Sequence, residues 1–123
     1  MKIVLSGEFT DQNEYIKAER SNAAWAARIK EDETTRVYYE TVNRHPKITE
    51  YPLDVVFVWY CKNRRKDPDN IAFSIKFIFD GLQLSHIIDN DGWKQVNSIK
   101  HVFRVDKNNP RVEILLEKSG ESK

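Results

Sequence analysis

The sequence predicts an α+β domain in which helices pack on one mixed β-sheet, with the elements in the order β-α-β-α-β-β. Two observations lead to this prediction. The run LDVVFVWYC at 53–61 is almost wholly apolar and rich in β-branched and aromatic residues, which is typical of a central strand covered on both faces. Stretches with helical periodicity lie before and after it, and two further strand-like runs, at 93–105 and 111–118, close the chain.

The length and composition are those of one folded unit. The 123 residues fit a single domain, 1–123, and 40% hydrophobic against 32% charged residues exclude a disordered chain. No apolar run approaches the roughly 18 residues of a membrane span, so no membrane partner is expected. Cys61 is the only cysteine, and the start lacks a signal-peptide pattern, which favours a cytoplasmic location. With a net charge of +1, nucleic acid could be bound only through a local basic patch.

The first half of the chain is expected to contain one strand and one long helix. KIVLSGEF at 2–9 alternates like a strand, and the polar TDQNEY at 10–15 predicts a turn or loop. An Ala-rich stretch without Gly or Pro predicts a helix over 21–42, with Ser21 as its N-cap. The two prolines of HPKITEYP at 45–52 end that helix.

A second helix is expected from Asp69 onwards. Its apolar face would comprise Ile71, Ile75, Ile78, Phe79 and Leu82, which recur at helical spacing. The segment HIIDNDG at 86–92 predicts a turn. The residues DKNNP at 106–110 favour a turn between the last two strands and predict a β-hairpin. The closing EKSGESK at 117–123 is expected to be a short frayed tail.

Acidic residues gather at both ends of this second helix. Asp67 and Asp69 lie where the central strand meets the helix, and Asp91 lies in the turn that follows the helix. At about 100° per residue, Asp69, Lys76 and Asp80 fall on one edge of a continuous helix. Three carboxylates supply the oxygen ligands that Mg²⁺ or Mn²⁺ prefers, provided that the turn folds back across the sheet end to bring Asp91 to the other two.

A basic run adjoins the acidic residues. Lys62, Arg64, Arg65 and Lys66 directly precede Asp67. Such a pairing suggests a polyanion whose backbone is held by basic side chains while metal ions act at one phosphate. A nearby lysine would suit a reaction in which phosphate oxygens gain negative charge.

Each residue also has an ordinary explanation. Asp69 alone most often caps a helix, and Asp67 before Pro68 is often a turn residue in an extended conformation. Lys76 alone, and the run KNRRK at 62–66, are usually solvated surface. The combination, rather than any single residue, points to metal-dependent chemistry on a polyanion.

The same residues resemble a known family. The stretch RKDPDN, a lysine four residues before DGL, and the closing DND resemble the RusA family of Holliday-junction resolvases, which are Mg²⁺-dependent endonucleases often encoded by prophages. The segment GEFTDQNEYIKAERSN is similar to the Gram-positive and phage branch of that family. The similarity in element order covers nearly the whole chain.

The resemblance implies roles for individual residues. Asp67, Asp69 and Asp91 would bind Mg²⁺, with Mn²⁺ as a possible substitute, and Lys76 would be the catalytic lysine. Two further residues would support the site or contact DNA, namely Asn70 and Lys66.

This sequence departs from the family pattern at two places. The best-known members carry the lysine four residues after the second Asp, where this chain has Phe73 and places Lys76 seven residues after Asp69. Many members have adjacent acids where this chain has DND, so Asp89 is either a helper or a turn residue. The displaced lysine favours an alternative function without catalysis.

The resemblance also implies a homodimer, because a two-fold axis matches the two symmetric cuts that resolve a four-way junction. Tyr38, Tyr39 and Phe103 are candidates for its interface. The sequence therefore predicts an endonuclease that resolves Holliday junctions or other branched DNA by hydrolysing phosphodiesters with metal-activated water. The alternatives are a non-catalytic nucleic-acid-binding module of prophage origin and a structural protein in which the acids cap helices. Junction sequence preference, the number of metal ions and the participation of Asp80 remain open.

Overall fold

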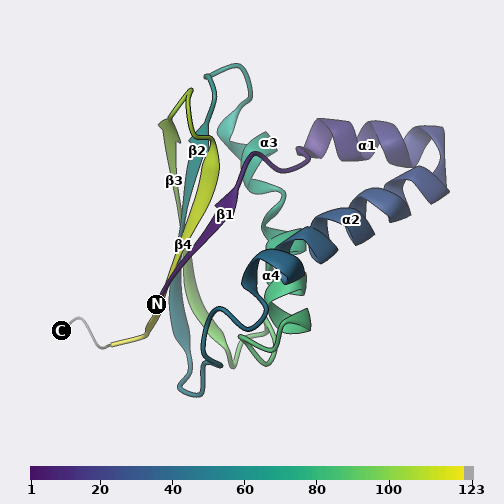
Figure 1. Cartoon of the computed structure of the whole chain (residues 1–123). Helices are drawn as coiled ribbons and strands as arrows, with labels where there is room; N and C mark the ends of the chain where they lie inside the picture. The colour runs from purple at the N-terminus through teal and green to yellow at the C-terminus, as the bar shows by residue number, and fades with distance from the viewer. Residues whose placement is uncertain (121–123) are drawn as a thin grey trace.

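Four strands form one mixed sheet in the computed structural model of the chain, which describes residues 1–120. The sheet order is β1-β4-β2-β3, with the strands β1 (Lys2–Ser6), β2 (Leu53–Cys61), β3 (Val96–Val105) and β4 (Arg111–Lys118). The helices lie together on one face of this sheet (Figure 1), and they are α1 (Gln12–Ser21), α2 (Ala23–Thr41), α3 (Pro68–Ala72) and α4 (Ile75–Leu84). The predicted α+β class and mixed sheet are confirmed.

The strand β2 is interior to the sheet, as its apolar sequence predicts. It pairs in parallel with β3 and antiparallel with β4. Alternate side chains of β2 point toward the helices and are buried, among them Val55, Phe57 and Trp59. Phe57 meets Phe79 of α4 edge to face, with 5.5 Å between the ring centroids. The core therefore lies between the sheet and the helices.

The predicted hairpin of the last two strands is wrong. β3 and β4 lie on opposite sides of β2 and do not pair with each other. The turn between them crosses the end of β2, where the Asp106 N–H donates to the carbonyl oxygen of Cys61 at 2.8 Å. A central strand has two edges whose backbone N–H and C=O groups need partners. Here β3 pairs with one edge of β2 and β4 with the other, and one short turn connects β3 to β4.

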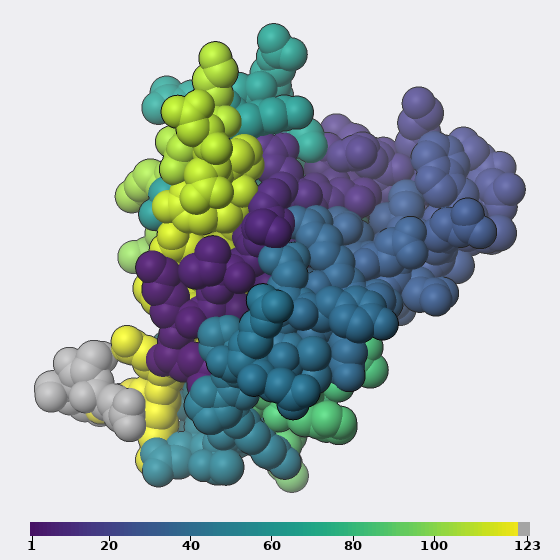
Figure 2. Space-filling model, viewed as in Figure 1, coloured from purple at the N-terminus to yellow at the C-terminus, as the bar shows by residue number. Residues whose placement is uncertain are grey.

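The first helical region contains two helices rather than one. Residues 12–21 form α1, although the sequence predicts a turn or loop at 10–15. Asp11 caps α1 and forms a capping box with Glu14, a D-x-x-E pattern that is visible in the sequence. Asn22, not Ser21, is the N-cap of α2, because its side chain accepts from the Ala24 N–H at 2.8 Å. The space-filling view shows α1 and the start of α2 projecting away from the sheet (Figure 2).

The second helical region is also divided. Ser74 has a ψ of 2°, far from the α-helical value of about −42°, so α3 ends before it and α4 begins after it. Of the predicted apolar face, Ile78, Phe79 and Leu82 are buried, whereas Ile71 and Ile75 are partly exposed. The break means that Asp69 and Lys76 do not share one helix edge, which corrects the predicted alignment.

The remaining expectations concern the membrane and the tail. No helix within residues 1–120 combines the length and apolar character that a membrane span requires. At the C-terminus, Glu117 and Lys118 belong to β4, and the Ser119 N–H donates to the carbonyl oxygen of Pro52 at 2.8 Å. The part of the predicted tail at 121–123 lies outside the described residues.

The crossing of α2 and α4 depends on Gly81. A Cβ at this position would overlap the side chain of Val37 on α2 and lie 3.0 Å from the carbonyl oxygen of Thr34. We expect Gly81→Ala to lower the free energy of unfolding by about 2 kcal/mol, because overpacking outweighs the better helix propensity of Ala. Urea unfolding measures this difference.

The matched control for this substitution is Gly92→Ala. A Cβ at Gly92 would meet nothing nearer than the Gln95 side-chain oxygen at 3.5 Å, an ordinary contact. Its effect should stay within about 0.5 kcal/mol. Equal effects of the two substitutions would show that the α2–α4 crossing does not need glycine.

Candidate functional site

The turn between β2 and α3 presents the first two predicted acids. Asp67 has an extended backbone, with φ −71° and ψ 150°, as expected before proline. Its carboxylate is exposed and makes no capping hydrogen bond to α3, so helix capping does not account for it. Asp69 is exposed in the first turn of α3, where its Oδ1 accepts from the neighbouring Asn70 N–H at 2.9 Å.

Asp67 lines a pocket at the carboxyl ends of the parallel strands β2 and β3. This strand-end pocket has a volume of about 430 Å³ and an apolar wall that includes Ile71 and Phe103. The charged residues among its lining are Asp67, Arg64, Lys66 and Arg104. Arg104 was missed by sequence reasoning, because only the parallel pairing of β3 with β2 brings it to the loop after β2.

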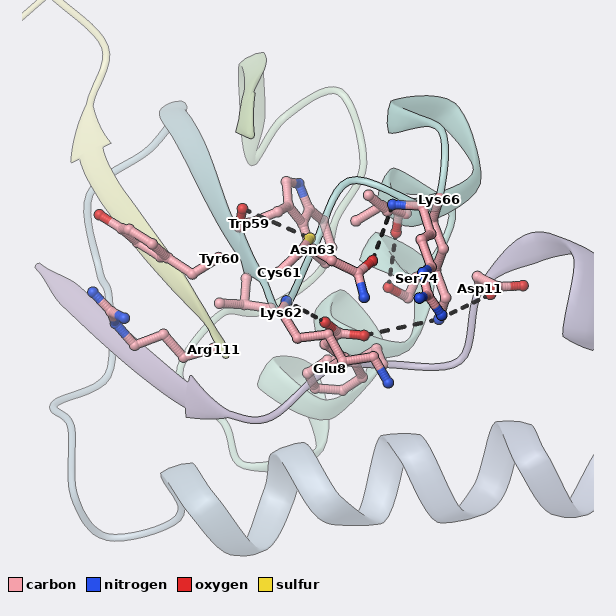
Figure 3. A pocket seen from close by; sticks show the side chains of 14 residues that line it. Glu8, Asp11, Trp59, Tyr60, Cys61, Lys62, Asn63, Lys66, Ser74 and Arg111 are labelled. Atoms are coloured by element: carbon pink, nitrogen blue, oxygen red, sulfur yellow. Dashed lines mark hydrogen bonds and ion pairs between the residues drawn. The ribbon is translucent and has the colours of Figure 1, made fainter. Parts of the chain in front are cut away.

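A second pocket, the inner pocket, lies on the other side of the same loop (Figure 3). It has a volume of about 200 Å³. The segment that follows β1 contributes Glu8, Phe9 and Asp11, and the end of β2 contributes Trp59 and its successors. The two pockets share Cys61, Asn63, Lys66 and Ile71, and are therefore neighbours.

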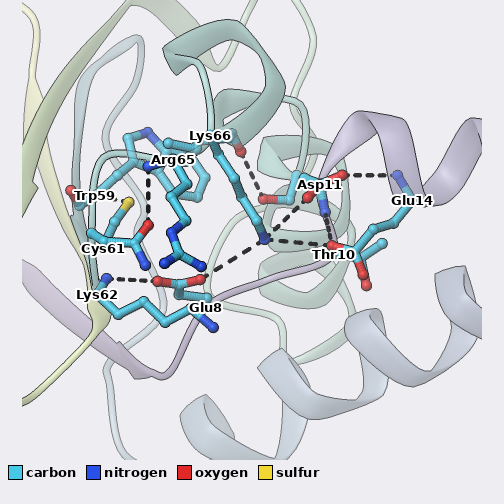
Figure 4. A network of polar contacts seen from close by, with 12 residues as sticks. Glu8, Thr10, Asp11, Glu14, Trp59, Cys61, Lys62, Arg65 and Lys66 are labelled. Carbon is cyan, nitrogen blue, oxygen red and sulfur yellow. Dashed lines mark hydrogen bonds and ion pairs between the residues drawn. The ribbon is translucent and has the colours of Figure 1, made fainter. Parts of the chain in front are cut away.

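Lys66 is held by three carboxylates of the N-terminal segment (Figure 4). Its Nζ lies 3.0 Å from Asp11 Oδ2, 3.5 Å from Glu14 Oε1 and 3.9 Å from Glu8 Oε1. Asp11 is buried, with 5% of its surface exposed. Of the two roles predicted for Lys66, these contacts favour supporting the site over contacting DNA.

Both members of the closest pair have shifted pKa values. Burial alone would raise the pKa of Asp11, but hydrogen bonds from Glu14 and Lys66 outweigh it and hold this pKa below its usual value. Burial alone would lower the pKa of Lys66, but the hydrogen bond and charge of Asp11, helped by Glu14 and Glu8, raise it. Both shifts favour the ionised pair.

Two hydrogen bonds join the same segments. The Asn70 side-chain oxygen accepts from the Asn13 N–H at 2.9 Å, and Glu8 Oε2 accepts from the Lys62 N–H at 2.7 Å. We call these bonds and the Lys66 ion pairs together the N-terminal clamp. It joins two groups of residues: Glu8, Asp11, Asn13 and Glu14 of the N-terminal segment, and Lys62, Lys66 and Asn70 around the loop after β2. The clamp holds both ends of the loop that carries Asp67.

We expect Lys66→Met to lower the free energy of unfolding by about 2 kcal/mol, because it leaves the buried Asp11 carboxylate without its charged partner. The control is Lys2→Met, which removes an exposed ion pair with Glu113 at 3.0 Å and should cost at most about 0.5 kcal/mol. Urea unfolding at neutral pH compares them. If the two variants were equally stable, the clamp would add nothing to the fold.

The pH dependence of this difference follows from the direction of the pKa shifts. The pKa of Asp11 is lowered from 3.8, so the stability it contributes is present above that value and lost as pH falls through the folded pKa. The pKa of Lys66 is raised from 10.5, so its contribution is present below that value and lost as pH rises through the folded pKa. Wild type and Lys66→Met should therefore differ most between these limits.

Asp91 lies at the other end of the sheet. It lies a few residues before Gln95, whose carbonyl oxygen accepts from the Leu53 N–H at the start of β2 at 2.8 Å. Asp67, by contrast, follows the end of β2, whose nine residues span about 28 Å. Figure 1 shows the β2–α3 and α4–β3 connections at opposite ends of the sheet. Within one chain, the expected meeting of Asp91 with Asp67 and Asp69 does not occur.

The neighbouring acids and the predicted lysine have their own partners. Lys76 Nζ lies 3.4 Å from Asp80 Oδ1 on the exposed side of α4, and its side chain is 61% exposed. Asp89 pairs with Lys47 at 3.3 Å, and its N–H donates to the Tyr51 hydroxyl at 3.0 Å. These contacts are those of surface residues, and they bring neither Lys76 nor Asp89 to Asp67.

The rest of the basic run is free to meet a ligand. Within residues 1–120, the side chains of Lys62, Arg64 and Arg65 are exposed and form no ion pair with an acidic side chain of the chain. Only the backbone of Arg65 is engaged, since its N–H donates to Asn63 Oδ1 at 3.0 Å. Three positive charges therefore lie beside the two pockets without internal neutralisation.

Within one chain, the carboxylates near Asp67 could supply only some of the ligands of a Mg²⁺ ion. Across residues 1–120, no three His, Cys, Asp or Glu side chains are grouped so as to hold a metal ion. Asp67 and Asp69 nevertheless offer exposed carboxylate oxygens on one short turn. Magnesium commonly binds through one or two carboxylates together with water and substrate phosphates, which these two residues fit.

Comparison with known proteins adds no relative. No protein-family model matches the sequence, and no curated protein is significantly similar to it. The function is therefore inferred from the geometry of the loop after β2 and from the resemblance carried by the motifs.

Proposed function

We propose that this chain is a Mg²⁺-dependent endonuclease that acts on branched DNA, as the resemblance to the RusA resolvases implies. The observation that carries the proposal is the place of Asp67 in the strand-end pocket, beside Arg64 and Arg104. An acidic residue and two arginines that line one pocket suit a phosphodiester, because the acid can hold a metal ion while basic groups hold phosphate oxygens.

The residues divide into three roles under this proposal. Asp67 and Asp69 hold Mg²⁺, which when bound lowers the pKa of water and neutralises charge on the phosphate. Arg64 and Arg104 bind the phosphates of the cleaved strand. Lys66 and the rest of the N-terminal clamp keep the acidic loop in position.

A second copy of the chain would complete the acidic set. β3 is an edge strand of ten residues, and one of its edges has no strand beside it among the described residues. If two copies paired antiparallel along β3 about a two-fold axis, the start of each β3 would lie beside the end of the other. Asp91 of one copy would then approach the strand-end pocket of its partner, which neither chain achieves alone.

The exposed surface of β3 is compatible with such pairing. Ile99 and Val105 are 42% and 47% exposed although they lie on the helix side of the sheet. Phe103, one of the interface candidates from sequence, is partly buried on the same strand. Two sites related by a two-fold axis would match the two symmetric cuts of junction resolution.

A non-catalytic DNA-binding module is the second candidate. It is favoured by the remote Asp91 and by Lys76, which pairs with Asp80 rather than with the acidic loop. Incubation of the protein with a synthetic four-way junction, with and without Mg²⁺, separates the two. Symmetric Mg²⁺-dependent cuts support the endonuclease, and tight binding without cuts supports the module. Either function suits the cytoplasmic location expected from the sequence.

The exposed arginines make a further prediction. We expect Arg64→Ala combined with Arg65→Ala to weaken junction binding and to reduce the slope of log affinity against log salt by roughly 0.9 for each lost phosphate contact. Lys2→Ala, on the opposite edge strand, is the control and should leave the slope unchanged. Titration of labelled junction at several salt concentrations measures the slope. An unchanged slope in the double variant would remove these arginines from the DNA interface.

A further inference from the structure

We propose that the inner pocket binds one unpaired base of the DNA strand whose phosphate lies in the strand-end pocket. This inference rests on the proposed function. It assigns a ligand to a pocket that the metal-dependent chemistry does not use.

The position of the inner pocket suits a nucleotide next to the cleaved phosphate. The two pockets share Cys61, Asn63 and Ile71, so a strand with its phosphate in one could direct a neighbouring base into the other. Bases leave the stack at least cost where they are already unpaired or lie in single-stranded DNA. A branched substrate would therefore supply the ligand.

The size and walls of the inner pocket suit a single ring system. Its volume of about 200 Å³ is below the 300–1,000 Å³ that is usual for drug-sized ligands. Its apolar lining includes Phe9, Trp59 and Val112, which are 7%, 2% and 2% exposed and belong to the rigid core. Such walls can exclude water from the faces of a planar ring.

Two polar groups in the pocket can meet the edge of a base. Asn63 Oδ1 already accepts from the Arg65 N–H, which leaves the amide NH₂ of Asn63 as a donor. Glu8 adds carboxylate oxygens as acceptors, although one of them also accepts from the Lys62 N–H. A donor and an acceptor together complement the mixed edges of nucleobases.

The charge of the lining favours an anionic ligand such as a nucleotide over a neutral or cationic small molecule. Four basic residues are among those that line the inner pocket, against the two acids Glu8 and Asp11. Arg111 pairs with Asp106 and Glu113, both at 2.8 Å, and Lys66 pairs within the clamp. The exposed Lys62 and Arg65 remain to attract the phosphates on either side of the bound base.

Binding of two short oligonucleotides in the absence of metal tests the inference. One is fluorescent pentathymidylate, and the other has the same backbone and charge but lacks the central base. We expect wild type to bind the complete oligonucleotide about tenfold to a hundredfold more tightly, the usual range for a stacked base. Ile71→Phe, which fills the inner pocket, should abolish this ratio. Because Ile71 also lines the strand-end pocket, the ratio of the two affinities, and not either affinity alone, is the readout. Ile71→Val is the matched control and should keep the ratio.

A second variant keeps the inference testable if Ile71→Phe does not fold. Asn63→Ala removes the free donor without adding volume, and it should reduce the ratio at least severalfold. Equal binding of the two oligonucleotides by wild type would overturn the inference. A ratio that survives in both Ile71→Phe and Asn63→Ala would also overturn it, because the base would then bind elsewhere.

Junction cleavage by the wild type distinguishes the failure of this inference from failure of the proposed function. Cleavage without a base-dependent ratio would overturn the pocket assignment alone. A ratio that depends on Ile71 without any cleavage would support the pocket and remove the nuclease. Absence of both binding and cleavage would overturn both.

Discussion

A mixture of two inactive variants, Asp67→Asn and Asp91→Asn, is expected to recover about a quarter of the wild-type rate of junction cleavage. Each variant alone should lose activity by about 10³-fold, the scale of other lost charge-stabilising groups. The physical reason is the distance within one chain, where the two residues lie at opposite ends of β2. A site that needs both must draw them from two copies.

The arithmetic of the mixture follows from two-fold symmetry. Random assembly makes about half of the dimers mixed, and each mixed dimer carries one site with both substitutions and one site with neither. The mixture should therefore nick one strand of the junction rather than cut both. The assay is single-turnover cleavage of labelled junction after the two variants have been unfolded and refolded together.

Two controls make this result decisive. A chain with both substitutions, mixed with wild type, should form mixed dimers in which each site has one altered acid. Its intact sites, again about a quarter, then lie only in wild-type dimers, so this mixture should cut both strands and leave no single nicks. Asp89→Asn mixed with Asp67→Asn tests whether the neighbouring acid takes part. If Asp67→Asn and Asp91→Asn mixtures stayed inactive while each variant still formed dimers and bound DNA, a site shared between copies would be wrong.

The catalytic role that the resemblance to RusA resolvases implies for Lys76 predicts that Lys76→Ala slows cleavage by about 10²–10³-fold with little change in junction affinity. The side chain is 61% exposed and its pair with Asp80 is on the surface, so its loss should change the free energy of unfolding by no more than about 0.5 kcal/mol. A large effect on rate without one on stability would identify a charge that acts on the phosphate during cleavage.

Asp80→Asn is the matched variant for Lys76. It releases the Lys76 ammonium from its only ion-pair partner among the described residues and leaves the charge in place. Cleavage should then be retained or raised. Single-turnover rates at saturating protein compare the variants, and a rate of Lys76→Ala within a few-fold of wild type would return this lysine to the surface and favour the non-catalytic module.

Local patterns in the sequence were sufficient for several elements. The apolar run 53–61 predicts the interior strand β2 within its observed bounds, but the expected cover on both faces is wrong, because the helices lie on one face and the alternate side chains on the other face are only partly buried. The extended backbone of Asp67 follows from the proline after it. The α+β class follows from the order in which strand-like and helix-like hydrophobic patterns follow one another along the chain. Each of these depends on neighbours in sequence alone.

The partners of each element were decided only by the tertiary structure. The hairpin prediction failed because turn residues at 106–110 show that the chain reverses, but not that β2 enters between the two strands. The helix predicted from Asp69 failed at Ser74, where Tyr15 of α1 packs against Phe73 and Phe77 at centroid distances of 5.4 and 5.8 Å. Packing between segments overrides helical periodicity within one segment.

In the candidate site, too, some features follow from local sequence and others only from tertiary structure. The sequence alone indicates which residue types are candidates for the proposed chemistry, since an acid pair after an apolar strand and an adjoining basic run can be read directly. The tertiary structure decided where those side chains lie: Arg104 joins Asp67, Lys66 turns to Asp11, and Asp91 lies at the far end of the sheet. The physical reason is strand direction. Parallel pairing of β2 with β3 separates the turn before β3 from the turn after β2 by the full length of the strands.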